Sequence, residues 1–510
     1  MKVLLVHPYI TSEKNEFMQT LSEPLGLLSL ATYMDERSRK RISISLLDLY
    51  ALGHDRFVER ADGMITRGMC DKREIAAHLK EIKPGVIGIH CTFTGYARDV
   101  IEIANICKEV FPEVPVVLGG AHASYDYENI LSKHSCIDYI VRSEGEETFY
   151  ELVEAIEAGN GAGHIKGLAF RVKDGKVTLN PDRDLIRDLN DIPIVDRAYI
   201  DMGTYKKLNH ESFPVAMNYP VATIMASRGC PYNCIFCSTK NMWRKKWRGR
   251  HPSHIIREIE YLIINYGIKE IVFYDDQFLV DKKWVNDVCD AIISKNFKIT
   301  LSLPSGISLW LADSNLLRKM KKAGFYRIHF PIESGNPETI KFIRKPINLE
   351  NVLKVIKAAN KMGFWTSANF IIGFPDETFE DINRTLKFAY ECGIDYPVFI
   401  IAKPLAGAEL YEIMKKNGFL RSFDTSSSLF VAKNDTRYFK ADELVKIRNE
   451  AEQNYFKNKI RWYFNPYNFF FYFLPKIISL NGLKYSFKII SSIRKGKHKR
   501  VFEKRTEGSQ

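Results

Sequence analysis

Three cysteines that lie close together in the chain are its strongest chemical signal. Cys230, Cys234 and Cys237 stand in a C-x3-C-x2-C spacing, whereas the other six cysteines are scattered. Three thiolates on one loop shaped by glycine and proline can hold three irons of a [4Fe–4S] cluster. The fourth iron then lacks a protein ligand and can take a substrate or cofactor. Zinc is the rival, but structural zinc normally takes four ligands in paired CxxC form.

The elements that precede this motif are indicated by alternating apolar and helical patterns. Within residues 1–158, strands are predicted at 2–7, 42–49, 85–91, 114–119 and 139–142, and a helix at 146–158. This alternation favours an α/β domain with a doubly wound, Rossmann-like parallel sheet. Ligands of such sheets bind beyond the carboxyl ends of the strands. Those ends carry Thr92, Gly119, Gly120, His122, Glu144 and Gly145.

A glycine-rich break after residue 158 is followed by a predicted hairpin and linker over residues 159–219. From residue 220 the alternation resumes, with six strands predicted at 221–227, 270–276, 298–304, 327–334, 366–374 and 396–403. Six successive βα units predict a partial (βα)6 barrel of the TIM type over residues 220–420. The active face of such a barrel lies at the carboxyl ends of its strands.

Asp275 and Asp276 end the second barrel strand and are the candidate catalytic residues. Neighbouring residues of a strand point to opposite faces, so one of them is expected to reach the site. Capping of a helix is an equally good role for the other. The sequence leaves open which residue does which.

Composition excludes several classes of protein. With 45% hydrophobic and 26% charged residues, the chain of 510 residues is neither disordered nor fibrous. No apolar run approaches the roughly 18 residues of a membrane-spanning helix, and the first residues lack a signal-peptide pattern. Nine cysteines are too few for a disulfide scaffold. A cytoplasmic location is therefore expected.

The last predicted region, residues 421–510, is mostly helical and unusually aromatic and basic. Residues 455–473 contain eleven aromatic residues, and residues 451–510 hold +10 of the net charge of +13. Such a segment suits peripheral contact with the inner, anionic face of a membrane. It could equally pack on the barrel and close the active site. Nucleic acid is not expected as a partner, because no known binding module is present.

The cysteine motif, with Phe236 directly before its last cysteine, resembles the hallmark of the radical SAM superfamily. The resemblance continues over about residues 220–415. It implies that Glu333 and Ser334, at the end of the fourth barrel strand, contact the ribose of S-adenosylmethionine (SAM). It also implies that Ile372 and Gly373 present their backbone to the adenine. Pro331 and Ser308 depart from the family pattern, which usually has a glycine and an arginine there.

Residues 1–158 resemble the cobalamin-binding domain that precedes the barrel in one large radical SAM class. The segments 23–31, 117–123 and 138–146 carry this resemblance. It implies that cobalamin lies against the strand-end residues named above, with Gly119 and Gly120 allowing its nucleotide tail to approach the backbone. The Asp-x-His-x-x-Gly pattern surrounds none of the twelve histidines, so no histidine from that motif is expected beneath the cobalt.

The two resemblances together imply a cobalamin-dependent radical SAM enzyme, most simply a C-methyltransferase acting on an unactivated carbon. A reduced cluster would cleave SAM to a 5′-deoxyadenosyl radical, and methylcobalamin would donate the methyl group. A ring-forming or rearranging oxidation without methyl transfer is the alternative, and a non-catalytic cobalamin-binding module is a remote one. The expected partners are a small-molecule or lipid-like substrate and an electron donor such as flavodoxin or ferredoxin.

Overall fold

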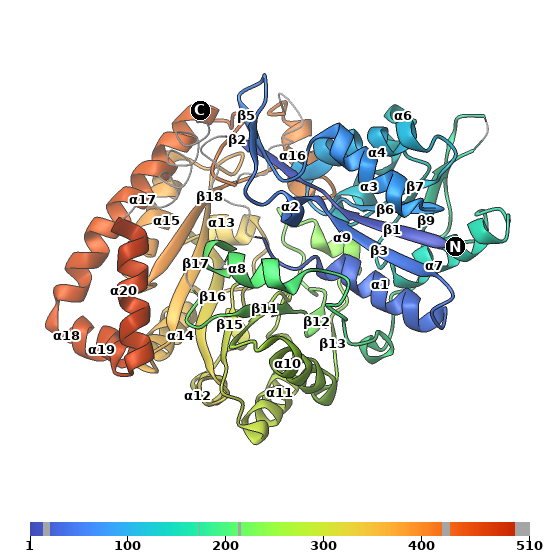
Figure 1. Cartoon of the computed structure of the whole chain (residues 1–510). Helices are drawn as coiled ribbons and strands as arrows, with labels where there is room; N and C mark the ends of the chain where they lie inside the picture. Colours follow the sequence, from blue (N-terminus) through green and yellow to red (C-terminus); the bar gives the residue numbers. More distant parts are fainter. Residues whose placement is uncertain (14–20, 173, 213–215, 421–428, 495–510) are drawn as a thin grey trace, which may run out of the picture. The chain divides into compact units, whose positions relative to one another are not determined.

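The computed structural model describes residues 1–13, 21–172, 174–212, 216–420 and 429–494 (Figure 1). The chain divides into two compact units. The first is built mainly from Met1–Leu208, and the second begins at Asn209 and holds most of the remaining chain. The first break between compact units therefore falls inside the region predicted as hairpin and linker.

The first unit contains a seven-stranded sheet with the strand order β10-β9-β8-β7-β6-β1-β3. Five strands are parallel: β1 (Lys2–His7), β3 (Ser43–Asp48), β6 (Val86–His90), β7 (Val116–Gly119) and β8 (Tyr139–Val141). The predicted doubly wound sheet is confirmed. The hairpin β9 (Leu168–Arg171) and β10 (Val177–Leu179) extends it in antiparallel fashion. The strand order reverses between β1 and β6, and ligands of such sheets bind at that switch point.

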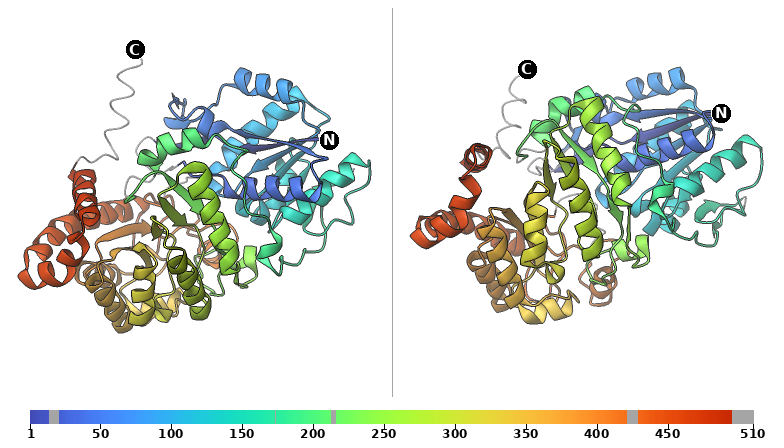
Figure 2. Two further views of the ribbon diagram at one scale, coloured as in Figure 1. Left: turned by 60° about the horizontal axis from the view of Figure 1, so that its bottom comes forward. Right: turned by 90° about the horizontal axis from the view of Figure 1, so that it is seen from below.

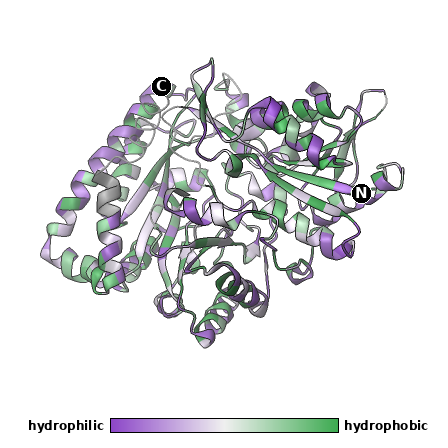
Figure 3. Ribbon diagram, viewed as in Figure 1, coloured by the Kyte–Doolittle hydropathy of each residue, from purple (hydrophilic) through white to green (hydrophobic). Residues whose placement is uncertain are grey.

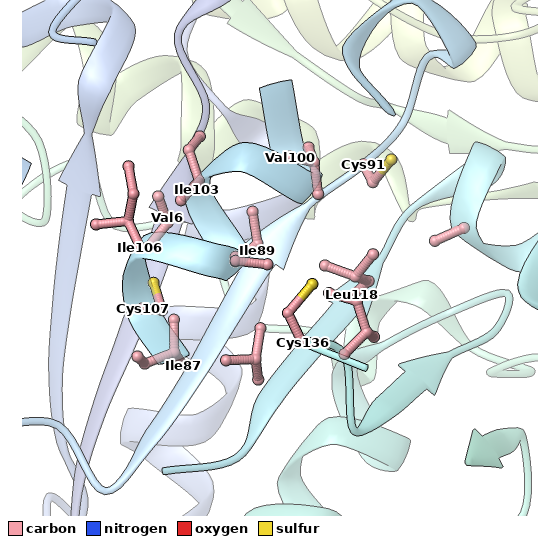
Figure 4. Close-up of a cluster of buried hydrophobic side chains, with 14 of the residues drawn as sticks. Val6, Ile87, Ile89, Cys91, Val100, Ile103, Ile106, Cys107, Leu118 and Cys136 are labelled. Carbon is pink, nitrogen blue, oxygen red and sulfur yellow. The ribbon is translucent and has the colours of Figure 1, made fainter. Parts of the chain in front are cut away.

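Helices cover both faces of this sheet, which is why its strands are continuous apolar runs. They include α1 (Leu25–Arg37), α3 (Lys72–Ile82), α4 (Ala97–Val110), α6 (Tyr127–Lys133) and α7 (Glu146–Glu157). Figure 4 shows one of the two resulting cores, where Val100 and Ile103 of α4 pack against strand residues such as Ile89. The other core lies on the opposite side of β1 and joins α1 to α7.

A small antiparallel sheet in the first unit was not predicted. It consists of β2 (Ile10–Glu13), β4 (Phe57–Glu59) and β5 (Met64–Arg67). These strands are short and mixed in polarity, so they carry no clear alternation. A buried tertiary contact holds them instead: Asp99 of α4 accepts hydrogen bonds from Thr11 N at 2.7 Å and from Thr11 Oγ1 at 2.6 Å.

The second unit contains a sheet of six parallel strands in chain order, as predicted for a partial barrel. These are β11 (Val221–Ile224), β14 (Glu270–Phe273), β15 (Thr300–Leu303), β16 (Phe325–Glu333), β17 (Trp365–Ile372) and β18 (Tyr396–Ile401). The main connecting helices are α10 (Pro252–Tyr266), α11 (Lys282–Lys295), α12 (Ser314–Lys322), α14 (Leu349–Lys361) and α15 (Phe379–Glu391), which Figure 2 shows on the outside of the strands. The first strand is shorter than predicted, because Ser227–Arg228 pairs separately as β12 with β13 (Arg248–Gly249).

Shorter helices complete the two units. They are α2 (Leu49–Leu52), α5 (Ala121–Tyr125), α8 (Met202–Ser212), α9 (Thr239–Trp243), α13 (Pro337–Phe342) and α16 (Glu409–Lys416), with single turns at Thr94–Tyr96, Leu189–Asp191 and Leu309–Leu311.

The C-terminal region is helical, as predicted, and packs on the barrel (Figures 1 and 2). It comprises α17 (Ala441–Phe464), α18 (Pro466–Asn468), a π-helical turn (Phe469–Phe473), α19 (Leu474–Ile477) and α20 (Leu480–Arg494). Helix α17 runs along β18, where Arg448 Nε donates to Phe399 O at 3.0 Å. It thereby covers an edge strand that would otherwise be open to pairing. No helix in the described ranges is long and apolar enough to cross a bilayer.

Candidate active site

The loop that carries the three cysteines is fixed to the barrel by its own backbone. Ile235, 1% exposed, lies in an apolar cluster with residues that follow β16, β17 and β18. Its N–H donates to Ile343 O at 3.3 Å, and its carbonyl accepts from Leu410 N at 2.9 Å. The buried side chain of Ile235 and these two backbone hydrogen bonds together hold the loop at the carboxyl ends of the barrel strands.

Asp275 fixes the segment that leads into this loop. Its carboxylate is 1% exposed and accepts hydrogen bonds from Ala226 N at 3.3 Å and from Ser227 Oγ at 2.6 Å. Burial raises the pKa of Asp275 to about 7. Asp276 accepts from Gly229 N at 3.3 Å, one residue before Cys230. Both carboxylates therefore position the start of the cysteine loop.

The helix-capping role considered for one of these aspartates falls to another residue. Helix α11 begins at Lys282, and its N-cap is Asp281, which accepts from Trp284 N at 3.1 Å. The sequence could not separate the three aspartates, because Asp275, Asp276 and Asp281 lie within seven positions of one another.

The three thiols of the loop are close enough to influence one another. Burial raises the pKa of Cys230 to about 12, and the charges of Cys237 and Cys234 act in the same direction. Burial also raises the pKa of Cys234 to about 11, although Lys345 opposes this. Among the residues that the structure describes, no three His, Cys, Asp or Glu side chains converge on a single ion. Three thiolates in one loop, without the paired CxxC spacing of structural zinc sites, suit a cluster in which each thiolate binds a different iron.

Glu333 occupies a strained position at the end of β16. Its φ is +70°, a region that non-glycine residues rarely adopt. The register of β16 against β17 shifts between Pro331 and Glu333. A proline fits such an irregularity because it has no N–H to donate to a neighbouring strand. The proline at position 331, where the family usually has a glycine, is therefore part of the β-bulge that precedes Glu333.

Lys345 was not singled out from the sequence, yet it lies at the centre of the site. Its Nζ donates to Glu333 Oε1 at 3.0 Å, and the two side chains are only 5% and 6% exposed. The ammonium lies 6.0 Å from the ring centroids of Phe236 and Trp310. Burial lowers the pKa of Lys345, but Glu333 and Cys234 more than offset this, so the net shift is upward. Only a Lys-Pro dipeptide after α13 marks the residue in the sequence.

Ser308, which stands where the family often has an arginine, supports the cysteine loop. It is fully buried, its Oγ donates to Gln277 Oε1 at 3.0 Å, and the same Oγ lies 3.3 Å from Tyr232 OH. Trp310 Nε1 donates to the same Tyr232 hydroxyl at 3.0 Å. Tyr232 lies between the first two cysteines, so Ser308 supports the loop rather than supplying a cation to it. Lys345 is a buried cation beside the loop.

The other residues expected to contact SAM are Ser334, Ile372 and Gly373, and each is held by contacts within the barrel. Ser334 is fully buried, and its Oγ lies 2.7 Å from Thr385 Oγ1, so its side chain holds the strand end. Ile372 is also fully buried. Gly373 has a φ of +82°, and its N–H donates at 2.8 Å to Glu377. These contacts fix the backbone after β17.

The two glycines at the end of β7 have different surroundings. A Cβ on Gly120, whose φ is +111°, would lie 2.7 Å from Cys91 O, so this glycine is required by the protein's own backbone. A Cβ on Gly119 would meet only Val141 O, at 3.9 Å. Close by, Thr92 Oγ1 bonds His90 Nε2, while the buried His90 Nδ1 has no partner in the described structure. Open room beside Gly119 and an unsatisfied polar atom fit a large polar ligand at this edge.

The remaining residues expected at cobalamin are held by contacts within the first unit. His122 is 3% exposed, and its Nδ1 lies 3.2 Å from Thr94 Oγ1. Glu144 accepts from Ile186 N at 2.9 Å. A Cβ on Gly145 would meet Leu30 at 3.2 Å, so this glycine allows close packing of α7 on α1. These three positions are explained by packing and by the course of the chain after β10.

Comparison with known proteins assigns both units to families. Residues 224–389 match the model of the radical SAM superfamily, and residues 19–153 match that of the B12-binding domain. An uncharacterized methyltransferase of Pyrococcus horikoshii is 33% identical over 478 residues, which are 94% of each chain. A cytidylyl-2-hydroxyethylphosphonate methyltransferase of Streptomyces wedmorensis is 29% identical over 458 residues, 84% of each chain. Other relatives, at 27% to 28% identity, are named anaerobic magnesium-protoporphyrin IX monomethyl ester cyclases.

Among solved structures, the methyltransferase TsrM from Kitasatospora setae, with cobalamin and a [4Fe–4S] cluster bound, is similar in fold. The TM-score is 0.66 at 16% sequence identity, and the match covers 84% of this chain and 81% of TsrM. The cysteine loop, the two family matches and the relative that spans nearly the whole chain agree. The chain belongs to the cobalamin-dependent radical SAM family and is a radical SAM enzyme.

Proposed function

We propose that the protein is a cobalamin-dependent radical SAM methyltransferase acting on an unactivated carbon. The observation that carries this proposal is the cysteine loop, whose three thiols lie beside a buried Lys345–Glu333 pair. The relatives that span most of the chain carry the name methyltransferase. A ring-forming oxidation with the same cofactors is the second candidate, because other relatives are named cyclases.

Cys230, Cys234 and Cys237 would hold the cluster, and the residues around them would hold SAM. Glu333 would accept the ribose hydroxyls, while the backbone at Gly373 would face the adenine. Lys345 would bind the carboxylate of SAM. It would thereby replace the arginine that the family often has at position 308, where this chain has a serine. The protein's own work is to hold and orient these groups in a buried site, while the cluster, SAM and cobalamin supply radical formation and the methyl group.

The edge of the first sheet would hold cobalamin, with Gly119 as the position that leaves room for it. We expect Gly119→Trp to abolish binding of hydroxocobalamin to the anaerobically reconstituted protein, because the indole would occupy the open space. Iron content should stay unchanged. Corrinoid absorbance after gel filtration measures the result.

Gly120 is an unsuitable position for this test, although both glycines were expected to serve the same purpose. Any side chain there strains a positive φ and clashes with the Cys91 carbonyl, so loss of binding would report misfolding. Gly163, beside which a Cβ would meet no atom within 4 Å, provides the matched control as Gly163→Trp. Full cobalamin binding by Gly119→Trp would refute the assignment.

Product analysis tests the proposed reaction. A methyltransferase of this type consumes one SAM for the radical and a second for the methyl group. S-adenosylhomocysteine should therefore appear in addition to 5′-deoxyadenosine. Formation of 5′-deoxyadenosine without S-adenosylhomocysteine would favour the ring-forming oxidation.

The electron donor, the class of substrate and the location in the cell are further proposals. We propose an electron donor such as flavodoxin or ferredoxin, because reduction of a cluster needs a low-potential partner. We also propose a lipid-like substrate and a cytoplasmic location at the inner face of a membrane. The apolar and basic character of the C-terminal helices supports this location.

A further inference from the structure

The C-terminal helices expose an unusual number of large apolar side chains. Of the 21 such exposed side chains in the described residues, ten lie within residues 460–487. We call these ten the aromatic face: Ile460, Phe464, Tyr467, Phe469, Phe470, Phe471, Ile478, Leu480, Leu483 and Phe487. Phe464 is 82% exposed and Ile478 is 80% exposed. Figure 3 shows hydrophobic residues where α17 leads into α18. A concentration of this kind marks an interaction surface.

The helices that carry the aromatic face are firmly attached to the barrel. Lys476 forms a buried ion pair with Asp395, which lies just before β18, and donates to Asn360 Oδ1 at 2.8 Å. Lys459 Nζ donates to Gly393 O at 3.2 Å. On α20, the buried Tyr485 packs against barrel residues. The aromatic face is thus a fixed surface of the folded protein.

These attachments also show at which end of the barrel strands the C-terminal helices lie. Gly393 and Asp395 precede β18, so α19 and the end of α17 lie at the amino ends of the strands. The cysteine loop lies at the carboxyl ends. The expected packing on the barrel is therefore observed, but these parts of the tail lie at the end opposite the site and do not close it. The aromatic residues divide into buried anchors and the exposed face.

The positive charge of the C-terminal region indicates which kind of partner fits the aromatic face. Residues 453–502 contain eleven Lys or Arg and no Asp or Glu. Within the described part, Lys457, Arg461 and Lys484 are exposed beside the face. Lys361 Nζ lies 5.7 Å from the ring centroid of Phe471. A second copy of the chain would bring two basic surfaces together, which is unfavourable, whereas an anionic bilayer complements both the charge and the apolar side chains.

We propose that the aromatic face docks this enzyme on the surface of an anionic lipid bilayer, with its exposed side chains entering the interface while the helices stay packed on the barrel and no described segment crosses the bilayer. Aromatic side chains would insert at the headgroup level, and each basic residue near the surface would contribute roughly 1 kcal/mol. That electrostatic part is screened over about 8 Å at physiological ionic strength. The surface is separate from the cysteine loop, so this docking does not depend on methyl transfer.

Vesicle flotation with the full-length reconstituted protein tests the proposal. The vesicles contain either phosphatidylcholine alone or phosphatidylcholine with one-third phosphatidylglycerol. We expect binding to the anionic vesicles that falls steeply as salt rises, and little binding to the neutral ones. The triple variant Lys457→Glu/Arg461→Glu/Lys484→Glu should bind at least about 100-fold more weakly, since three basic residues are worth roughly 3 kcal/mol.

Two sets of serine substitutions, one on the aromatic face and one elsewhere on the surface, test the contribution of the exposed apolar side chains. Phe464→Ser/Phe470→Ser/Ile478→Ser should lose flotation, whereas Ile264→Ser/Phe379→Ser, at exposed apolar positions elsewhere, should keep it. Iron content and thermal unfolding should match the wild type in both. Equal flotation with neutral and anionic vesicles would overturn the proposal, as would retained flotation of the serine triple variant. Sedimentation velocity without vesicles completes the test, because a wild-type dimer that the serine variant abolishes would assign the face to self-association instead.

Discussion

Cys234→Ala is expected to remove the iron–sulfur cluster and to abolish reductive cleavage of SAM. The anaerobically reconstituted wild type should bind about four iron and four sulfide per chain. Cys234 is the most buried of the three cysteines, and of these thiols it has the largest electrostatic effect on Lys345. Without it the cluster loses one of three protein ligands, and 5′-deoxyadenosine formation should fall to the background of the protein-free reaction. Iron and sulfide assays with chromatography of the nucleoside measure both effects.

Cys289→Ala is the matched control for this experiment. Cys289 is fully buried on α11 and far from the loop in the chain, so its loss removes a buried thiol without touching the cluster. This variant should retain its iron and its 5′-deoxyadenosine formation. If the triple variant Cys230→Ala/Cys234→Ala/Cys237→Ala kept full iron and activity, the account of the site would be wrong.

Lys345→Met is expected to have the second largest effect, a loss of both stability and SAM binding. Methionine keeps most of the length of the side chain but leaves the Glu333 carboxylate buried without its partner. Breaking a buried pair from one side costs about 3–5 kcal/mol. The variant should therefore unfold at a lower urea concentration than the wild type. It should also lose measurable SAM binding in titration calorimetry, because the proposed carboxylate partner is gone.

The double variant Glu333→Gln/Lys345→Met separates stability from binding. It removes both charges together, so most of the unfolding free energy should return. SAM binding should stay lost, because both proposed contacts are absent. Wild-type SAM affinity in either variant would contradict the assignment of these residues to SAM, whatever their effect on stability.

The sequence predicted the elements of both units well where their strands are covered on both faces. Strand β1 was predicted residue for residue, because burial from both sides makes such a segment uniformly apolar. The small sheet of β2, β4 and β5 was missed, since its stability comes from the buried carboxylate of Asp99 rather than from its own pattern.

The site was predictable only as far as it is local in the chain. The cysteine loop could be recognised from its spacing, but the Lys345–Glu333 pair joins side chains on either side of α13 that are 12 positions apart in the chain. The two glycines after β7 look equivalent in the sequence. Their different roles depend on the Cys91 backbone, which belongs to the neighbouring strand end. Likewise, the family resemblance implied a ligand contact for Ser334, whereas its Oγ lies 2.7 Å from Thr385 Oγ1, on a helix far along the chain. Such long-range contacts leave no local signal.

The fate of the methyl group of SAM tests the central claim most directly, and it needs no knowledge of the substrate. The reconstituted protein, loaded with cobalamin and reduced, is mixed with SAM that carries a deuterated methyl group. The account predicts that about one equivalent of S-adenosylhomocysteine forms per bound corrinoid, that the corrinoid acquires the deuterated methyl group, and that 5′-deoxyadenosine appears in the same sample. Mass spectrometry detects all three products. If 5′-deoxyadenosine forms while the corrinoid stays unlabelled and no S-adenosylhomocysteine appears, the proposed methyl transfer is contradicted.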